Sequence, residues 1–279
     1  MSKIGSELAQ QRIGFLGAGA MAEALAGGLL AAGVDAGRIR AADPDPARRQ
    51  RLQQKLGIAT LPDNAAVVEQ SDVVVLAVKP QVARRVLAEL PRGEHLLRPL
   101  WISIAAGVRL ARLEAQLPAG ARIARAMPNT PALVRSGATA VCGNPHAGPG
   151  DLELARTLFE SVGVCWVAPA EELLDAVTGL SGSGPAYVFV FIEALGDAGE
   201  RVGLPREAAR ALAVQTVLGA AQLAFEDGRA PAELRAQVTS PGGTTLAGLE
   251  RLEAAGFRDA VRAAVEAATR RSVELGQES

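Results

Sequence analysis

Hydrophobic positions divide the chain into two parts with different periodicity. As far as Val167, short apolar runs alternate with stretches of helical spacing, and some runs are apolar at consecutive positions, as in residues 73–78. Strands that are covered on both faces have this pattern, and their alternation with helices is typical of βαβ units. Strands are predicted at Arg12–Gly17, Ile39–Ala42, Val73–Val78, Leu100–Ala105, Arg122–Ala126, Thr139–Cys142 and Val164–Val167, with helices at Pro46–Leu56, Gln81–Leu90 and Gly150–Ser161.

Residues 169–279 predict helices only. Pro205 and Pro231 suit the first turns of helices, and Gly203 and Gly228 suit the stops before them. The predicted helices are Glu171–Leu180, Pro185–Val202, Pro205–Asp227, Pro231–Val238, Thr244–Ala255 and Phe257–Leu275.

The fold class is therefore predicted as α/β. An N-terminal Rossmann-like doubly wound sheet occupies residues 1–168, and an all-α domain occupies residues 169–279. The second domain contains a long apolar stretch at Tyr187–Leu195. We expect a second subunit to cover that face, so the domain is predicted to mediate dimerisation. The alternative is a self-contained monomeric bundle.

Composition and charge narrow the class of protein. Hydrophobic residues make up 49% of the 279 and aromatic residues only 3%, which suits helices and buried parallel strands. The net charge is −1, with both signs interspersed, so neither a nucleic-acid partner nor a membrane surface is predicted. The apolar stretch 13–33 is interrupted by Glu23, and no other run nears the length of a membrane span. A soluble, cytoplasmic protein is expected.

Metal and thiol chemistry find no support in the sequence. Cys142 and Cys165 lie in apolar contexts that predict strand packing. His95 and His146 lie beside loops rich in proline and glycine, and no Cys/His cluster has the spacing of metal ligands. No metal is predicted, and a dehydrogenase with a histidine base is disfavoured. Hydride delivery to a carbon that is already electrophilic fits better.

The most informative segment reads Arg-Ile-Gly-Phe-Leu-Gly-Ala-Gly over residues 12–19, with a helical pattern directly after it. Gly17 permits a sharp turn, Gly19 lets the backbone approach a pyrophosphate, and Ala22 is a third small residue for close packing of helix on strand. Free N–H groups at the start of the helix would then face the anion. The pattern predicts a dinucleotide site, although glycine turns also occur for structural reasons.

The choice of dinucleotide stays open at the end of the second strand. Asp43 lies where a carboxylate would accept the ribose hydroxyls of NAD and repel a 2′-phosphate. Arg48 and Arg49 follow closely, and a guanidinium there would hold such a phosphate. A purely structural alternative is that Asp43 caps the helix that starts near Pro46.

Three further segments follow predicted strands at the ligand-binding edge of the sheet. Lys79 would contact phosphate or ribose, or else be an ordinary solvated loop lysine. The small residues of Ser103–Gly107 would let a flat ring pass the strand ends. Asn129 offers an amide for a carboxamide, or closes a turn in a loop that two prolines stiffen.

Two glycine- and serine-rich segments stand out in the helical part. Residues 179–187 read Gly-Leu-Ser-Gly-Ser-Gly-Pro-Ala-Tyr and residues 238–245 read Val-Thr-Ser-Pro-Gly-Gly-Thr-Thr. Each would place helix N-terminal N–H groups beside hydroxyls, which suits a small carboxylate. The alternative is plain N-capping, by Ser183 in one segment and by Ser240 or Thr244 in the other.

Together these segments resemble the pyrroline-5-carboxylate reductase family, in the family's order and from residue 12 to the end. The segments that carry the resemblance are Gly17–Gly19, Ala77–Pro80, Ser103–Gly107, Ile123–Pro131, Asp175–Tyr187 and Val238–Thr245, and the last two are the most specific. The resemblance implies reduction of 1-pyrroline-5-carboxylate to L-proline with NADPH or NADH, the last step of proline biosynthesis. It also implies homodimers that assemble further, often to decamers.

The resemblance also implies a site. The substrate carboxylate would bind at Gly242, Gly243, Thr244 and Thr245, the Thr245 hydroxyl would lie near the ring nitrogen, and Thr245 and Ser240 would orient the iminium or a water. A partner's helical domain would complete each site. The cofactor would contact Leu16, Gly17, Ala18, Gly19, Ala20, Met21, Asp43, Asn64, Ala77, Val78, Lys79, Pro80, Ser103, Ala105, Ala106 and Asn129.

One residue departs from the family pattern, and two other classes of protein are alternatives to a reductase. Family members that favour NADPH often carry a small polar residue where Asp43 stands, so the phosphate preference is in doubt. A β-hydroxyacid dehydrogenase would need a catalytic lysine in the helical domain, and residues 169–279 contain none. A regulatory protein that senses nucleotides or binds pyridoxal would bind a cofactor without consuming it.

Overall fold

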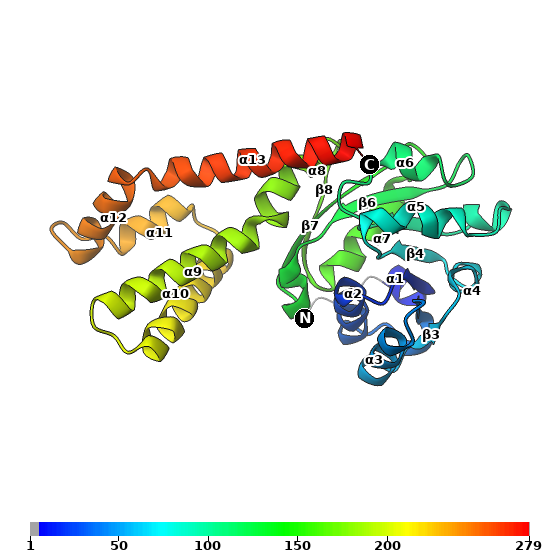
Figure 1. Ribbon diagram of the computed structural model, residues 1–279, viewed down its shortest axis with the longest axis horizontal. Coiled ribbons are helices and arrows are strands. Elements are labelled where there is room, and N and C mark those ends of the chain that lie inside the picture. The colour runs from blue at the N-terminus through cyan, green and yellow to red at the C-terminus, as the bar shows by residue number, and fades with distance from the viewer. Residues whose placement is uncertain (1–5, 279) are drawn as a thin grey trace. The chain divides into compact units, whose positions relative to one another are not determined.

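One eight-stranded sheet organises the first part of the chain. The computed structural model describes residues 6–278 (Figure 1). The strands lie in the order β3-β2-β1-β4-β5-β6-β7-β8, and every neighbouring pair is parallel except β6 and β7. The chain order reverses between β1 and β4, which is the switch point where ligands bind in doubly wound sheets. The strands are β1 (Ile13–Leu16), β2 (Ile39–Ala42), β3 (Ala59–Leu61), β4 (Val73–Leu76), β5 (Leu100–Ser103), β6 (Ile123–Met127), β7 (Gly137–Gly143) and β8 (Gly163–Val167).

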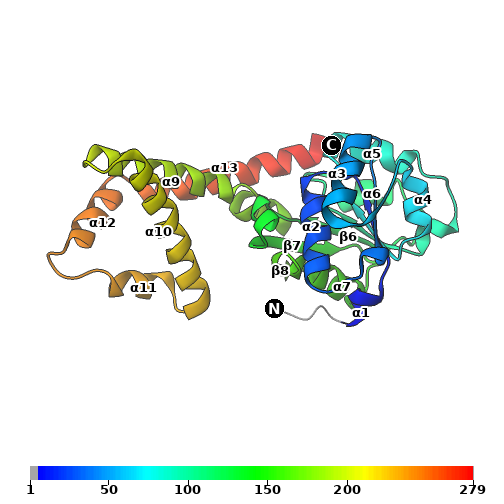
Figure 2. The ribbon, with the colours of Figure 1, turned by 90° about the horizontal axis from the view of Figure 1, so that it is seen from below.

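Helices cover both faces of the sheet (Figure 1, Figure 2). Alternate residues of one strand face opposite layers: Phe15 packs with the layer that contains α2 and α7, and Leu16 with the layer that contains α4, α5 and α6. Both layers are built mainly from Ala, Val and Leu. The bounds are α1 (Ser6–Gln10), α2 (Ala20–Ala31), η1 (Ala36–Arg38), α3 (Pro46–Leu56), α4 (Asn64–Glu69), α5 (Pro80–Ala88), η2 (Glu94–Leu97), α6 (Leu110–Glu114), η3 (Thr130–Val134) and α7 (Pro149–Glu160).

Two features of the sheet differ from the sequence prediction. All seven predicted strands are present, but β3 was missed because it has three residues and none of them is fully buried. The reversed direction of β7 was not predicted either. Only η3 and a short turn join β6 to β7, and so short a connection cannot hold the crossover that a parallel pair needs.

The rest of the chain is helical, and the contacts divide the molecule after Ser183 and again after Glu266. The last part of α13, from Ala267, belongs to the unit that contains the sheet. The domain boundary at residues 168 and 169 stays a prediction. The remaining helices are α8 (Leu173–Val177), the π-helical turn η4 (Thr178–Gly182), α9 (Gly184–Arg201), α10 (Arg206–Asp227), α11 (Pro231–Gln237), α12 (Thr244–Ala254) and α13 (Phe257–Glu278).

The helical unit, residues 184–266, contains little core of its own. Its two long helices α9 and α10 pack through small residues, since a Cβ on Gly199 would lie 2.9 Å from the Cβ of Ala209. Among the described residues of this unit, only Ala209 and Ala213 are fully buried apolar side chains. Large apolar side chains are exposed instead, namely Val188, Phe189, Val190, Leu212, Val214, Leu218, Leu223 and Phe225.

The expectation that no run other than residues 13–33 nears the length of a membrane span is wrong, because α10 is long and apolar enough by length and composition, and it is the one helix within residues 6–278 that passes that test. A helix that dimerises through an apolar surface has the same composition.

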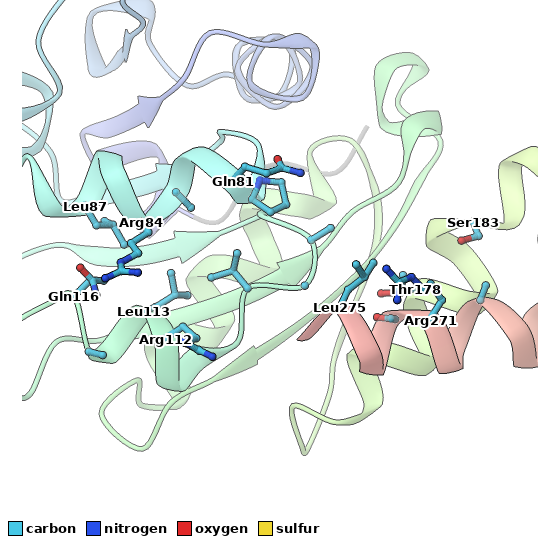
Figure 3. Close-up of a pocket in the computed structure, with 18 residues that line it drawn as sticks. Gln81, Arg84, Leu87, Arg112, Leu113, Gln116, Thr178, Ser183, Arg271 and Leu275 are labelled. Atoms are coloured by element: carbon cyan, nitrogen blue, oxygen red, sulfur yellow. The ribbon is translucent and has the colours of Figure 1, made fainter. Parts of the chain in front are cut away.

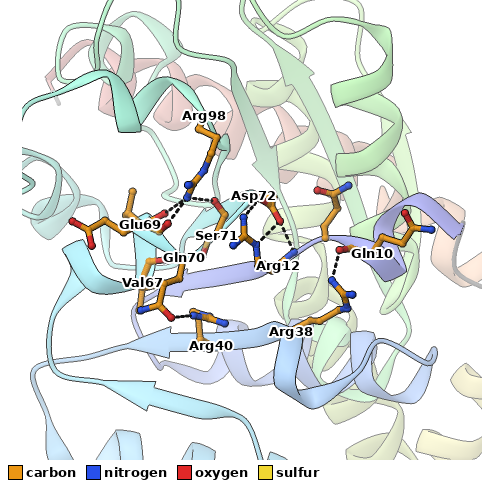
Figure 4. A network of polar contacts seen from close by, with 12 residues as sticks. Gln10, Arg12, Arg38, Arg40, Val67, Glu69, Gln70, Ser71, Asp72 and Arg98 are labelled. Carbon is orange, nitrogen blue, oxygen red and sulfur yellow. Dashed lines mark hydrogen bonds and ion pairs between the residues drawn. The ribbon is translucent and has the colours of Figure 1, made fainter.

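A polar network closes the amino edge of the sheet, opposite the predicted ligand edge (Figure 4). Arg12 and Asp72 form an ion pair with Nη2 and Oδ1 2.6 Å apart, and this hydrogen bond lowers the pKa of Asp72. Arg98 donates to the last carbonyls around the end of α4, including that of Ser71 at 3.1 Å. These side chains form hydrogen bonds with each other and with backbone groups at the ends of the strands and of α4, so we assign this edge a structural role.

Candidate active site

The glycine turn after β1 is formed as the sequence predicts. Gly17 has φ +104°, donates its N–H to the carbonyl of Ala42 at 2.7 Å, and leaves no room for a side chain. A Cβ at this position would lie 2.5 Å from the carbonyl oxygen of Ala77. Only glycine fits where the turn passes between the ends of β2 and β4.

The start of α2 is open and uncapped. Gly19 is the N-cap and supplies no side-chain hydrogen bond, so the N–H groups of Ala20 and Met21 have no acceptor within the helix. A Cβ built on Gly19 would meet nothing within 4 Å. Free donors and open space at the positive end of a 12-residue helix suit a pyrophosphate.

Asp43 is buried behind this turn. Its Oδ2 accepts the N–H of Ala18 at 2.9 Å, and its Oδ1 accepts that of Asp45 at 2.9 Å. The residue is 4% exposed, and the guanidinium of Arg48 lies 3.7 Å from Oδ2. The alternative in which Asp43 caps α3 is wrong, because the N-cap is Asp45, which accepts from Ala47. Asp43 instead joins the end of β2 to the glycine turn.

Most of the other predicted cofactor residues follow β4 and β5 at the same edge. Lys79 is exposed at the N-cap of α5, and Pro80 is its first residue. Ser103 and Ala105 are buried, whereas Ala106 is exposed. Ala77 and Val78, which directly follow β4, are partly buried. Leu16 is buried at the end of β1.

The two asparagines occupy different settings. Asn64 is the first residue of α4, which Asp63 caps. Asn129 is 8% exposed and uses both ends of its amide, since its Oδ1 accepts from Ala138 at 2.9 Å and its Nδ2 donates to the carbonyl of Ser181 at 3.0 Å. Asn129 therefore fixes the loop after β6 to the π-helical turn, and one amide hydrogen is left for a ligand.

A cavity of about 790 Å³ adjoins this edge (Figure 3). Pro80, Gln81 and Arg84 of α5 line one side, and the loop Ala106–Val108 lines another. Across the cavity lie Thr178 and Ser183 and the end of α13 with Arg271, Ser272 and Leu275. The volume falls within the range of small-molecule sites.

The predicted substrate residues form the start of α12 in the helical unit. Gly242 has φ +69°, and Gly243 is an N-cap with no side-chain hydrogen bond. Capping by Ser240 or Thr244 is therefore wrong for this helix. A Cβ on Gly243 would lie 2.4 Å from the Oγ of Ser240, so a larger residue there would displace the Ser240 hydroxyl. The N–H groups of Thr244 and Thr245 have no acceptor within the helix, and both residues are exposed.

The other glycine–serine segment is not an open helix start. Residues 178–182 continue α8 as a π-helical turn, and Ser183 donates its N–H back to the carbonyl of Thr178 at 2.8 Å. The expected carboxylate site and the expected cap at Ser183 are both absent from this described segment. The glycine-rich sequence predicted a turn, but the segment is helical because helices α8 and α9 continue into it from both sides.

Comparison with known proteins decides between the enzyme classes. The curated pyrroline-5-carboxylate reductase of Synechocystis is 50% identical over 267 residues, covering 95% of this chain and 98% of that protein. That of Pseudomonas aeruginosa is 46% identical over 270 residues, covering 96% and 97%. This chain belongs to the pyrroline-5-carboxylate reductase family.

Family models agree with this membership. The model for pyrroline-5-carboxylate reductase dimerisation matches residues 171–275, and the model described as NADP oxidoreductase, coenzyme F420-dependent, matches residues 12–107. The predicted fold class, the enzyme class of NAD(P)H-dependent oxidoreductase and a homo-oligomeric state are thereby confirmed.

Solved structures of the family superpose on most of the chain. That of the Coxiella burnetii enzyme has a TM-score of 0.90 at 40% identity, covering 95% of this chain and 98% of that one. The Plasmodium falciparum enzyme, solved with NADP bound, has a TM-score of 0.83 at 33% identity, covering 96% and 99%. The rival hydroxyacid dehydrogenase and the non-catalytic regulator are therefore set aside.

Sequence reasoning missed a buried polar cluster beside the site. It consists of two hydrogen-bonded sets, one of Asp175 with Arg109 and Ser272 and one of Glu171 with Arg125 and the backbone N–H of Leu110. Asp175 lies in one of the segments that resemble the family, but nothing in its local sequence indicated a partner. Its partners are 66 and 97 residues away.

Proposed function

We propose that this chain catalyses the last step of proline biosynthesis, reduction of 1-pyrroline-5-carboxylate to L-proline with NADH or NADPH. The observation that carries the proposal is 50% identity to a curated enzyme of that name over nearly the whole chain. The two uncapped helix starts, one at Gly19 and one at Gly243, are suited to the two anionic groups involved.

The chain's own residues favour the reaction chiefly by positioning. The bound reduced nicotinamide would supply a hydride to the carbon of the protonated imine, whose nitrogen already carries the proton that the amine product keeps. The turn at Gly17–Met21 holds the pyrophosphate, and Ala77–Pro80 and Ser103–Ala106 hold the nicotinamide end at the tips of β4 and β5. The N–H groups of Gly243, Thr244 and Thr245 bind the substrate carboxylate. Such fixing of two reactants lowers the entropic part of the barrier.

Thr245 and Ser240 lie beside the proposed carboxylate site and orient the imine nitrogen or a water. We expect Thr245→Ala to lower kcat/KM for the imine by roughly tenfold to 100-fold, since one positioned hydrogen bond to a charged group is worth about 1.5–3 kcal/mol. The dissociation constant for the cofactor, measured without substrate, should not change.

Thr239→Ala is the matched control for Thr245→Ala. The hydroxyl of Thr239 donates to the carbonyl of Arg235 at 2.7 Å and is outside the proposed site. Steady-state kinetics of both variants test the assignment. Wild-type kcat/KM in Thr245→Ala would refute a role for this hydroxyl.

We further propose that Asp43 makes NADH the preferred cofactor. The carboxylate of Asp43, held behind the glycine turn, repels a 2′-phosphate on the adjacent ribose. In Asp43→Ser the ratio of kcat/KM for NADPH to that for NADH should rise by roughly tenfold, equivalent to about 1.4 kcal/mol.

Asp45→Ser is the control for this preference, because it also removes a carboxylate near the turn but one whose role is to cap α3. Kinetics with each cofactor in turn give the ratio for both variants. An unchanged ratio in Asp43→Ser would show that the preference is set elsewhere.

We propose that each site is completed by the helical unit of a second copy, and that dimers assemble into decamers in the cytoplasm. Exposed apolar side chains on α9 and α10 support a second copy, and the dimerisation model that matches residues 171–275 supports the same region. Light scattering on purified protein gives the number of copies, and a stable monomer would contradict this part.

A further inference from the structure

A buried bridge joins the end of α13 to the loop that follows β5. The carboxylate of Asp175 accepts two hydrogen bonds, from Arg109 Nη2 to Oδ2 at 2.9 Å and from Ser272 Oγ to Oδ1 at 2.7 Å. Asp175 is 3% exposed and Ser272 is 5% exposed. Arg109 is the N-cap of α6 and ends the loop that begins at Ser103.

A second ion pair, of buried Arg125 with partly buried Glu171, holds the start of α6 directly after this loop. Glu171 Oε1 accepts the backbone N–H of Leu110 at 2.8 Å and Arg125 Nη1 at 2.7 Å. Arg125 lies on β6 and is 3% exposed. Charged groups that are buried this far cost desolvation, and they keep their positions because the partner would otherwise be left unpaired.

The loop packs into the core of the sheet through Ala105 and Val108, whereas its polar link to α13 runs through Asp175. Ala106, Gly107 and Val108 of the loop and Ser272 and Leu275 of α13 line the same cavity rather than filling it. The bridge through Asp175 links the end of this loop to α13 by hydrogen bonds, in addition to that packing. The fit is close, because a Cβ on Gly276 would lie 2.8 Å from the Nε of Arg109.

We infer that Asp175, Arg109 and Ser272 are positioning residues, which fix the loop Ile104–Arg109 so that it presents the nicotinamide end of the cofactor correctly. The inference rests on the proposed function, because that function places the nicotinamide at Ser103–Ala106. It adds that α13, whose residues 257–266 belong to the helical unit, also holds the loop after β5.

Two variants disturb the bridge without removing a charge. Ser272→Ala deletes one donor to Asp175. Gly276→Ala leaves all three residues in place but pushes Arg109 away from the carboxylate, because the flexible side chain must move to admit the new methyl group. Ser136→Ala is the control, since Ser136 is an exposed serine of the same unit outside the bridge.

Hydrogen exchange without any ligand gives a readout that is independent of activity. Both variants should exchange the amides of residues 104–110 at least about threefold faster than wild type, while the β1 and β4 amides are unchanged. In kinetics, kcat should fall roughly threefold to tenfold with the cofactor dissociation constant unchanged within about twofold, since most binding contacts lie at the glycine turn. A cofactor deuterated at the transferred position should show a larger isotope effect on kcat.

The outcomes separate the two proposals. Wild-type exchange in 104–110 together with wild-type kcat in both variants would overturn the positioning role. An equal loss of kcat and of cofactor affinity, with faster exchange throughout the sheet, would also overturn it, because it would indicate general destabilisation. If exchange rises only in the loop but wild-type protein does not reduce the imine, the proposed function fails and the bridge stands.

Discussion

Replacing Gly19 with alanine is expected to leave the fold intact and to weaken binding of the reduced cofactor by roughly 100-fold, or about 2.7 kcal/mol. The new methyl group meets no protein atom within 4 Å, and the backbone angles, φ −78° and ψ 180°, suit any residue. The melting temperature should therefore stay within about 2 °C of wild type. The open space that admits the methyl group is the space proposed for the pyrophosphate.

Gly148 provides a matched control for this substitution. It is the N-cap of α7 with nearly the same backbone angles, φ −74° and ψ 176°, and a Cβ there would have its nearest neighbour at 3.9 Å. Gly148→Ala should bind cofactor as wild type does. Fluorescence titration with NADH measures both variants, and unchanged affinity in Gly19→Ala would mean that the cofactor does not approach the start of α2.

Introducing a charge on α10 is expected to separate the copies and to remove activity. Leu218 is 55% exposed in the chain taken alone, and Leu223 and Phe225 nearby are also exposed. If a second copy covers this surface, Leu218→Glu buries an unpaired carboxylate, which costs several kcal/mol. We expect a monomer by light scattering, with activity reduced at least about tenfold and with cofactor binding retained.

Thr216→Glu adds the same charge at an exposed polar position two residues before Leu218, on the opposite side of the helix, and should change neither property. Sedimentation and kinetics at matched concentration test both variants. A fully active monomer of Leu218→Glu would contradict the proposal that each site needs a second copy.

The sequence predicted the elements that contain strong local signals. The glycine turn was found because positive φ at Gly17 and close approach at Ala77 leave glycine no substitute. The α3 bounds matched because Pro46 starts that helix and Gly57, with φ +69°, ends it. Strand β3 lacked any such signal, because it has only the three residues 59–61 and none of them is buried.

What depends on distant partners was beyond local reasoning. Asp43 was identified by its distance from the glycine turn, but its bond to the N–H of Ala18 shows that it also holds that turn in place. The bridge at Asp175 joins residues 109, 175 and 272, and no spacing rule relates them. The sequence predicted a helix that ends at Leu180 and a glycine–serine turn before Pro185, because glycine and serine favour turns when no packing is considered, whereas the helix continues through the π-helical turn at 178–182.

The most direct test of the central claim is an absorbance assay of reduced nicotinamide consumption with purified protein. Supplied with 1-pyrroline-5-carboxylate, the enzyme should oxidise NADH, and more slowly NADPH, while forming one proline per cofactor consumed. Gly19→Ala should be nearly inactive in the same assay, and Gly148→Ala fully active. Binding of NADH without any oxidation that depends on the imine would contradict the account.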